Sequence, residues 1–374
     1  MSRIRLSLLA SGVGLALALT ACGANQDNGD GGNEDGGSSG GEGGIKVGVI
    51  LPETASSARW EGFDKPMLEE ALKAEGLDPD IQNAQGDVNK FTTLADGMIN
   101  SGVKVLIIAS INSEVGGTVA QKAQEQGIPT IDYDRLNLGG SSKYYVSFDN
   151  VKVGELQGQG LADALKAKPG AEVIEVEGAP TDNNATLFHE GQRNILQPLY
   201  DANTLKLVQS RPIDNWDNQA GGTAFEQMLT ANGGKVDGVV AANDGLAGAI
   251  ITVLKKNGMN GTVPVTGQDA TADGLKAILA GDQYMTVFKP IKQEAEATAK
   301  LAALLAAGKD SEADALATDK SEDPTGGREV ASVLLEPELI TRAEVKKVID
   351  EGYVKAEEIC MGELAAACTE LGIS

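Results

Sequence analysis

Short runs of β-branched and other apolar residues recur along the chain from residue 45 onwards. Ten of these runs are predicted to be strands, at 45–51, 103–109, 128–133, 143–148, 171–177, 205–210, 236–242, 263–267, 284–288 and 330–335. Most are separated by stretches with apolar residues every three to four positions, such as 91–102 and 222–233, and this spacing predicts helices. Continuous apolar runs of this kind are typical of buried parallel strands.

The alternation of strands and helices predicts βαβ units and hence an α/β protein with doubly wound parallel sheets. The pattern runs twice, before and after about residue 149, without a close sequence repeat. Two similar α/β lobes are therefore expected. Ligands of such sheets bind beyond the carboxyl ends of the strands, so the polar residues that follow each strand are the first candidates for a site.

The first 44 residues have a different character. Arg3 and Arg5 precede the apolar run LSLLASGVGLALAL, which is short for a membrane span, and the run ends in LTAC. This resembles a bacterial lipobox, so we expect residues 1–21 to be a lipoprotein signal peptide and Cys22 to be lipidated. An ordinary secretory cleavage site with a stray cysteine is the alternative. Residues 22–44 are Gly-rich, acidic and nearly free of apolar side chains, which predicts a flexible linker outside the cytoplasmic membrane.

Two further cysteines, Cys360 and Cys368, lie close together near the C-terminus. Such a pair in an exported protein suggests a disulfide. In one unbroken helix the two residues would be about 12 Å apart, which is too far for a bond. We therefore predict a break near Gly362, with two buried free thiols as the alternative.

Composition excludes several classes of function. The formal net charge of −23 disfavours nucleic acid as a partner. His189 is the only histidine, so a His-based catalytic triad and a zinc site of several histidines are both excluded. The sequence also lacks a phosphate-binding Gly–Lys–Ser/Thr motif, and GQGLAD departs from the dinucleotide pattern at its third position. Neither a cofactor nor a metal is expected.

Polar and charged residues follow predicted strands in both halves of the chain. They are Asp134 and Arg135, Asp182 to Asn184, Asn243 and Asp244, Gln268 and Asp269, and Lys289. Each has a simpler explanation, because Asp and Asn are common helix N-caps, neighbouring opposite charges form local pairs, and a lysine is usually solvated. Their joint occurrence, with cations among them, favours a cleft that hydrogen-bonds several hydroxyl groups.

The chain is 4% aromatic and contains two tryptophans, one in each half. Trp60 follows the first predicted strand with Arg59 directly before it, and Trp216 follows a strand of the second half. A sugar ring has two apolar C–H faces that aromatic rings can cover. We therefore expect Trp60 and Trp216 to flank a sugar from opposite lobes, and Trp60 to be a platform for the ring instead of a residue that plugs the core.

The segments ARW, YDR, SFDNVKVGELQ, DNNATLF, AND, GQDA and MTVFKP occur in this order from residue 58 to residue 290. With these segments the chain resembles the type I periplasmic sugar-binding proteins of bacterial ABC importers, and among them most closely the xylose-binding members. The resemblance runs from Lys46 to about Leu335. It covers neither the Gly-rich linker nor the cysteine-bearing tail, and it carries no role to His189, where the family often has arginine.

The resemblance implies two lobes joined by a three-crossing hinge, with crossings near 147–150, 285–288 and 329–333. It places the N-terminal lobe at 45–148 plus 286–328 and the C-terminal lobe at 149–285 plus 329–374. It also implies a set of sugar-binding residues: Arg59, Asp134, Arg135, Asp182, Asn184, Asn243, Asp269 and Lys289, with Trp60 and Trp216 stacking on the ring.

The expected function is that of a lipid-anchored, monomeric solute-binding protein on the extracytoplasmic face of the membrane. It would bind a monosaccharide, D-xylose or a similar aldopentose, and deliver it to an ABC permease. Presentation of the sugar to a chemoreceptor is an alternative compatible with import. A carbohydrate-cleaving enzyme using Asp134 and Asp269 is a weaker one, because Arg135 and Lys289 would keep these carboxylates ionised.

Overall fold

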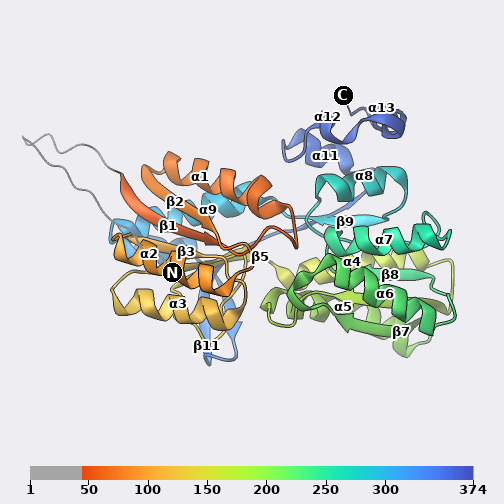
Figure 1. The fold of residues 1–374 in the computed structure, drawn as a ribbon, viewed down its shortest axis with the longest axis horizontal. Coiled ribbons are helices and arrows are strands. Elements are labelled where there is room, and N and C mark those ends of the chain that lie inside the picture. Colours follow the sequence, from red (N-terminus) through yellow and green to blue (C-terminus); the bar gives the residue numbers. More distant parts are fainter. Residues whose placement is uncertain (1–43, 374) are drawn as a thin grey trace, which may run out of the picture. The chain divides into compact units, whose positions relative to one another are not determined.

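The structure is a computed structural model that describes residues 44–373. Two sheets lie side by side along the longest axis, and helices cover both faces of each sheet (Figure 1). This confirms the predicted α/β class with two parallel-sheet lobes. The predicted signal peptide, the lipidation site at Cys22 and nearly all of the predicted linker lie outside the described residues.

The N-terminal lobe is built on a seven-stranded sheet in the order β10-β11-β5-β4-β3-β1-β2. All neighbouring strands in it are parallel except the pair β10–β11. Its strands are β1 (Ile45–Leu51), β2 (Leu77–Asn83), β3 (Val105–Ile108), β4 (Thr130–Tyr133), β5 (Tyr144–Phe148), β10 (Asp319–Asp323) and β11 (Arg328–Leu335). The edge strand β2 escaped prediction because its sequence, LDPDIQN, holds a proline and alternates exposed polar residues with apolar ones.

Alternate side chains of β1 point to opposite faces of this sheet. Val47 and Val49 pack on the side of α1 and α9, whereas Ile50 packs on the side of α2 and α3. The helical segments of the lobe are the π-helix η1 (Trp60–Asp64), α1 (Lys65–Ala74), α2 (Val88–Asn100), α3 (Ser113–Glu125), α9 (Ile291–Ala306) and α10 (Asp310–Leu316).

The C-terminal lobe has a smaller parallel sheet of three strands in the order β7-β6-β8, and β9 pairs separately with β12 in antiparallel fashion. These strands are β6 (Ala171–Glu177), β7 (Leu205–Pro212), β8 (Gly238–Ala241), β9 (Met285–Phe288) and β12 (Glu338–Thr341). The predicted strand at 263–267 forms only an isolated bridge between Val265 and Val239. Pro264 limits the pairing of this segment, because proline has no N–H to donate to a neighbouring strand.

Helices surround this second sheet and form the C-terminal tail. They are α4 (Asn150–Leu165), α5 (Asn183–Asp201), the 3₁₀ turn η2 (Asp214–Trp216), α6 (Asn218–Ala231), α7 (Asp244–Lys256), α8 (Ala272–Ala280), α11 (Val345–Asp350), α12 (Ala356–Ile359), the 3₁₀ turn η3 (Gly362–Leu364) and α13 (Ala365–Glu370). The tail packs on α8 and closes a separate apolar cluster of this lobe.

Three crossings connect the two lobes. The first follows β5 at residues 148–150, close to the crossing expected near 147–150. The second comes after β9, at residues 289–290, because β9 pairs with β12 inside the C-terminal lobe. The third comes between β11 and β12, at residues 336–337, because residues 331–335 pair with 144–148 in the first sheet. The structure thus moves the predicted lobe boundaries from 286 to about 290 and from 328 to 335, since sequence pattern does not show which sheet a strand joins.

The tail contains the predicted disulfide and the predicted break. Cys360 and Cys368 are bonded, with their Cα atoms 5.7 Å apart. Helix α12 ends at Ile359, and Gly362 adopts a left-handed conformation with φ of 58° before α13 begins. This conformation, which glycine adopts without strain, lets the chain turn back within eight residues.

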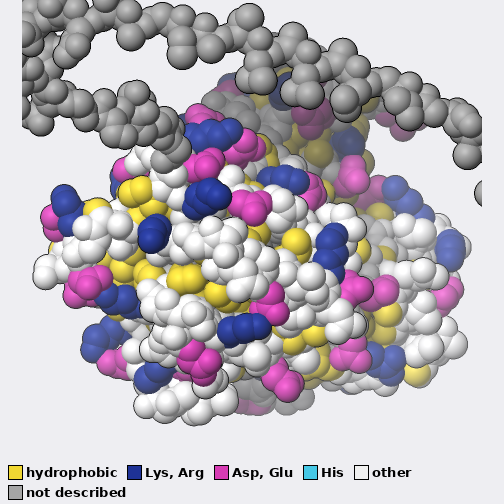
Figure 2. Space-filling model, turned by 60° about the vertical axis from the view of Figure 1, so that its left-hand side comes forward, with side chains coloured by type: hydrophobic (Ala, Val, Ile, Leu, Met, Phe, Trp, Pro, Cys, Tyr) yellow, Lys and Arg dark blue, Asp and Glu magenta, His cyan; other side chains and the backbone are white. Residues whose placement is uncertain are grey.

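The surface carries both kinds of charge in spite of the acidic net charge. On the face shown in Figure 2, basic and acidic side chains are interspersed over the surface of the described residues. None of the helices between residues 44 and 373 has the length and apolar character needed to cross a bilayer.

Candidate functional site: a charged cavity between the lobes

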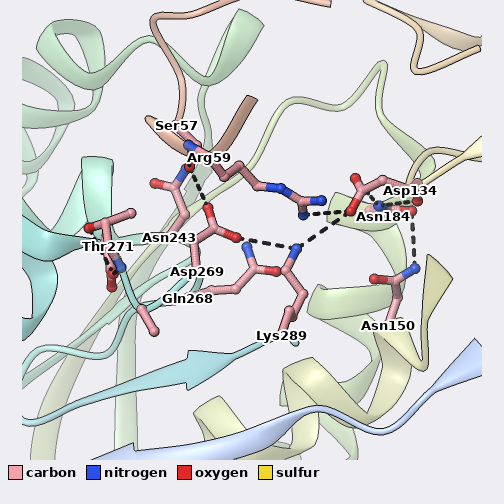
Figure 3. A network of polar contacts seen from close by, with 12 residues as sticks. Ser57, Arg59, Asp134, Asn150, Asn184, Asn243, Gln268, Asp269, Thr271 and Lys289 are labelled. Carbon is pink, nitrogen blue, oxygen red and sulfur yellow. Dashed lines mark hydrogen bonds and ion pairs between the residues drawn. The ribbon is translucent and has the colours of Figure 1, made fainter. Parts of the chain in front are cut away.

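All ten side chains predicted to form a site line one hollow between the lobes, which we call the inner cavity. It encloses about 310 Å³, including space open to solvent. Arg59, Trp60, Asp134 and Arg135 come from the N-terminal lobe, Lys289 comes from the second crossing, and Asp182, Asn184, Trp216, Asn243 and Asp269 come from the C-terminal lobe. Figure 3 shows most of the polar members facing one another across this hollow.

Arg59 is the centre of the N-terminal wall. It directly precedes η1, a short π-helix of a type that often occurs at functional sites. Its Nε and Nη2 donate to the two carboxylate oxygens of Asp64 at 2.8 and 2.6 Å, and its Nη1 donates to Oδ2 of Asp134 at 2.6 Å. Nη2 also lies 3.1 Å from Oε2 of Glu294 on α9. Because every contact lies within one lobe, Arg59 is held in place before any ligand arrives.

The same charges set the ionisation of this wall. Burial lowers the pKa of the Arg59 guanidinium, but the carboxylates around it outweigh burial and raise that pKa well above its usual value. Burial raises the pKa of Asp134, but the cations Arg59, Lys289 and Arg135 outweigh it and bring the pKa down to about 2. Asp134 is therefore a carboxylate at neutral pH, which suits hydroxyl recognition and not the work of a general acid.

Asp134 is also held by its backbone. It has φ of 61°, an uncommon conformation for a residue other than glycine, at the end of β4. Its carbonyl oxygen accepts hydrogen bonds from the hydroxyls of Tyr145 and Ser147, both at 2.8 Å, and from Nδ2 of Asn184 at 2.8 Å. The last of these bonds comes from the opposite lobe, so Asn184 joins the two walls.

Lys289 lies between two carboxylates at the second crossing. Its Nζ is 3.2 Å from Oδ1 of Asp269 and 3.7 Å from Oδ2 of Asp134 (Figure 3). The other carboxylate oxygen of Asp269 accepts from the hydroxyl of Ser57 at 2.8 Å. Lys289 thus neutralises one carboxylate from each lobe at the point where the chain itself crosses between them.

The C-terminal wall is made largely of helix N-caps. Oδ1 of Asp182 accepts from the backbone N–H of Asn184 at the start of α5, and Oδ1 of Asn243 accepts from that of Leu246 at the start of α7. Asp182 and Asn243 are therefore helix N-caps, as the simpler explanation of these residues states. Both use a second atom at the cavity: Oδ2 of Asp182 accepts from Nε1 of Trp216 and forms an ion pair with Nε of Arg135 at 3.0 Å, and Nδ2 of Asn243 donates to the carbonyl of Ser56.

Trp60 occupies both of the positions that the sequence analysis set against each other, the core and the candidate cavity. Its side chain is 2% exposed and belongs to the apolar cluster under α1 and α9, yet it also lines the cavity. The guanidinium carbons of Arg59 and Arg135 lie 4.7 and 5.1 Å from its ring centroid. The expectation that Trp60 does not plug the core is therefore wrong, because the ring is packed on the core side.

Trp216 reaches the cavity through a strained turn. Asn215 and Trp216 both have φ of 55°, and the indole Nε1 donates to Oδ2 of Asp182 at 3.1 Å. Gly178 is required next to the ring, because a Cβ at that position would lie 2.2 Å from Cη2 of Trp216. Phe188 supports the indole edge-on, with ring centroids 6.4 Å apart.

The predicted set of ten leaves out four residues that line the cavity, Ser56, Ser57, Phe188 and Gln268, although Gln268 was among the polar residues noted at strand ends. Two of them carried a usable signal. Phe188 lies one helical turn after Asn184, and Gln268 directly precedes Asp269 at a strand end. Ser56 and Ser57 carried none, because their loop reaches the C-terminal lobe only through tertiary contacts.

Three buried polar atoms of residues that line the cavity have no hydrogen-bond partner within residues 44–373. They are Nε1 of Trp60, Oε1 of Gln268 and Oδ1 of Asp269, the last of which is ion-paired with Lys289 at 3.2 Å. An unsatisfied buried group of this kind costs about 1–3 kcal/mol. Trp60, Gln268 and Asp269 all line the cavity, so they are candidate contacts for a hydroxyl-bearing molecule.

The described residues bring three potential metal ligands together at one place outside the cavity. Oxygens of Glu175 and Glu177 and a ring nitrogen of His189 lie within 4.8 Å of one another. Arg193 donates to Glu175 at 2.5 Å and to Nε2 of His189 at 3.2 Å. A guanidinium thus already supplies the positive charge that a metal ion would bring to this cluster.

Comparison with known proteins agrees with this architecture. A family model described as a periplasmic binding protein domain matches residues 47–310. The D-xylose-binding periplasmic protein of Escherichia coli is 35% identical over 316 residues, covering 84% of this chain and 92% of that protein. A multiple sugar-binding periplasmic receptor of Rhizobium radiobacter is 34% identical over 331 residues, again covering 84% and 92%.

Solved structures show the same likeness. The solute-binding protein of an ABC transporter from Clostridium phytofermentans, with bound β-D-glucose, superimposes with a TM-score of 0.77 at 29% identity, covering 84% of this chain and 99% of that one. A carbohydrate transporter solute-binding protein from Chloroflexus aurantiacus, in complex with D-glucose, gives 0.77 at 30% identity, covering 83% and 97%. These relatives are non-enzymatic components of transport systems. The chain therefore belongs to the periplasmic binding protein family.

Proposed function

We propose that this protein binds a monosaccharide in the inner cavity and delivers it to the permease of an ABC importer. D-xylose, or a similar aldopentose, is the proposed ligand. The protein would act on the extracytoplasmic face of the membrane, held there as a monomer by a lipid on Cys22. The names of the two sugar-binding relatives described above, together with the glucose bound in two structural neighbours, support a sugar as the ligand class.

The observation that carries the proposal is the set of side chains gathered around a cavity of about 310 Å³. Carboxylates of both lobes would accept hydrogen bonds from sugar hydroxyls, and the cations and amides between them would donate. Hydrogen bonds to charged groups contribute about 1.5–3 kcal/mol each. Trp60 and Trp216 would cover apolar faces of the ring.

Binding would be coupled to closure of the lobes, as in other periplasmic binding proteins. The cavity walls already touch through Asn184 and Asp134, and through Ser57 and Asp269. A sugar that contacts both walls adds interactions that exist only when the lobes are together. Such a ligand shifts the population toward the closed form by its differential affinity.

Isothermal titration calorimetry against D-xylose, L-arabinose, D-ribose, D-glucose and D-galactose tests the proposal. We expect tight binding of one or a few of these sugars, with the pentose preferred over the hexose of matching configuration if an aldopentose is the ligand. Absence of binding to every free aldose would refute the function. A preference for D-glucose would keep the function and refute the pentose assignment.

A further inference from the structure

One turn at the C-terminal wall of the inner cavity has an unfavourable backbone conformation. Asp269 and Ala270 have φ of 94° and 47°, so two successive residues other than glycine adopt conformations that such residues rarely adopt. The turn directs the carboxylate of Asp269 toward Ser57 and Lys289 (Figure 3). Strain of this kind persists only where surrounding contacts impose the conformation. The contacts that hold the turn therefore determine where the carboxylate of Asp269 lies.

The side chain of Asp244, in the first turn of α7, supplies several of these contacts. Its Oδ2 accepts hydrogen bonds from the backbone N–H of Thr271 at 2.9 Å and from the hydroxyl of Thr271 at 3.1 Å. Its Oδ1 accepts from Nε2 of Gln283 and from the hydroxyl of Thr286, both at 2.8 Å. The hydroxyl of Thr286 in turn accepts from the backbone N–H of Ala270 at 3.2 Å. Asp244 is thus linked to both residues that follow Asp269.

The residue before Asp269 is held by the backbone of Asp244, whose N–H donates to the carbonyl of Gln268 at 3.0 Å. The chain also packs closely around the carboxylate of Asp244. A Cβ at Gly267 would lie 2.2 Å from Oδ1, and a Cβ at Gly274 would lie 2.1 Å from Oδ2. Asp244 therefore contacts the chain on both sides of Asp269, in a space that has no room for larger residues at the two glycines.

The side chain of Asp244 does not itself line the inner cavity. Asp244 is 5% exposed, and the lining residues of the cavity do not include it. A carboxylate has about four acceptor positions, and the four hydrogen bonds from Thr271, Gln283 and Thr286 equal that number. An effect of Asp244 on the binding of a ligand therefore has to act through the turn that it holds.

We propose that Asp244 is a positioning residue for sugar binding. It holds the turn 268–271, through Thr271 directly and through the hydroxyl of Thr286, so that the carboxylate of Asp269 is already aimed into the inner cavity when the sugar arrives. A group that is ordered before binding does not have to be ordered by the ligand, which improves affinity. This inference rests on the proposed sugar-binding function.

The test is a double-mutant cycle of Asp244→Asn and Asp269→Asn, with calorimetry against D-xylose, or against D-glucose if the wild type prefers it. Asparagine keeps the shape of aspartate, but its amide nitrogen does not accept hydrogen bonds. We expect each substitution alone to weaken sugar binding by about tenfold or more. In the Asp269→Asn background, Asp244→Asn should weaken binding by less than about twofold more, because Asp244 acts through Asp269. Losses that multiply in the double variant would overturn the inference.

A second pair of variants tests the same link without changing either aspartate. Thr286→Val removes the hydroxyl between Asp244 and Ala270 but keeps a branched side chain. It should weaken sugar binding by about threefold or more, and this loss should also disappear in the Asp269→Asn background. Thr286→Ser retains the hydroxyl and should bind sugar as the wild type does. This pair decides the question even if Asp244→Asn does not fold.

Asp282→Asn is the matched control. Asp282 is also a buried aspartate of the C-terminal lobe, but it pairs with Lys255 at 2.7 Å beyond the C-terminal end of α8, whereas the turn 268–271 precedes the N-terminal end of that helix. Its substitution should lower stability and leave the sugar affinity within about twofold of the wild type. A loss of affinity as large as that of Asp244→Asn would attribute the effect to general destabilisation of the lobe and would overturn the inference.

The outcomes separate this inference from the proposed function. If the wild type binds a sugar and both Asp244→Asn and Thr286→Val bind it equally well, the inference fails and the proposed function stands. If the wild type binds no aldose at all, the proposed function fails and the inference fails with it.

Discussion

The two walls of the inner cavity are held in place by different kinds of interaction. On the N-terminal side, Arg59 is surrounded by carboxylates of its own lobe and is 2% exposed. On the C-terminal side, Asp182 and Asn243 are helix caps that turn a second atom toward the cavity. The N-terminal wall is therefore held by a buried network of charges. The C-terminal wall is held by residues that cap the first turns of helices.

This difference has a consequence for substitutions. Breaking a buried ion pair leaves an unpaired charge in the protein interior, which is strongly destabilising. Replacing a cap removes one hydrogen bond at a helix end, which costs far less. Changes on the N-terminal wall should therefore weaken folding and binding together, whereas changes on the C-terminal wall can weaken binding with little effect on folding.

The largest effect is expected for Arg59→Ala. Loss of the guanidinium leaves Asp64 buried without its cation and Asp134 with only the more distant Lys289 and Arg135, so we expect the free energy of unfolding to fall by about 3–5 kcal/mol. Urea denaturation measures this change. Lys65→Ala is the control, since Lys65 pairs with Glu61 on the surface and should cost less than about 1 kcal/mol. Equal effects of the two substitutions would contradict the idea of a buried charge network.

A second comparison uses the acid titration of one aspartate from each lobe. Burial raises the pKa of Asp244, behind the C-terminal wall, to about 7, whereas the surrounding cations lower that of Asp134 to about 2. The usual value of 3.8 applies to both in the unfolded chain. Protonation of Asp244 therefore favours the folded state as pH falls from 7 to about 4, by up to about 4 kcal/mol. Below pH 4, protonation of Asp134 removes about 2 kcal/mol of stability.

The two contributions can be separated by variants. Free energies of unfolding measured from pH 7 down to pH 2 should show the gain above pH 4 disappear in Asp244→Asn, and the loss below pH 4 become smaller in Asp134→Asn. The test compares how the free energy of unfolding changes with pH, not its absolute value. Asp244 also accepts hydrogen bonds from Thr271, Gln283 and Thr286, so its substitution lowers stability at every pH. A gain above pH 4 that persists in Asp244→Asn would refute this assignment.

The smallest effect on stability is expected at Asn243. Asn243→Ala removes the cap of α7 and should cost about 1 kcal/mol of unfolding free energy. Asn243→Ser restores a cap but not the amide, so stability should return while sugar affinity stays reduced. Thermal denaturation and calorimetry on the same samples give both quantities. Full recovery of affinity in the serine variant would show that Asn243 acts only as a cap.

The sequence pattern determined the fold class and the members of the candidate site. Apolar runs of β-branched residues form parallel strands because both faces of such a strand are buried, and β1, β3, β6 and β8 follow this rule. The site was found because the carboxyl ends of parallel strands meet at one edge, so residues such as Asp134 and Asp269 come together although 135 positions separate them. Cysteine spacing was enough to predict the break near Gly362.

Tertiary structure decided what each of these residues does. Whether Trp60 belongs to the core or to the site depends on which helices pack against it, and α1 and α9 place it in both. The sequence of β11 does not indicate which strand it pairs with. Only its pairing with β5 in the structure shows that the third crossing comes after Leu335. The contact of Asp182 with Arg135 and Trp216 joins three distant segments. A local pattern records the burial of each residue and its nearest neighbours along the chain, whereas hydrogen-bond partners are set by the packing of the whole molecule.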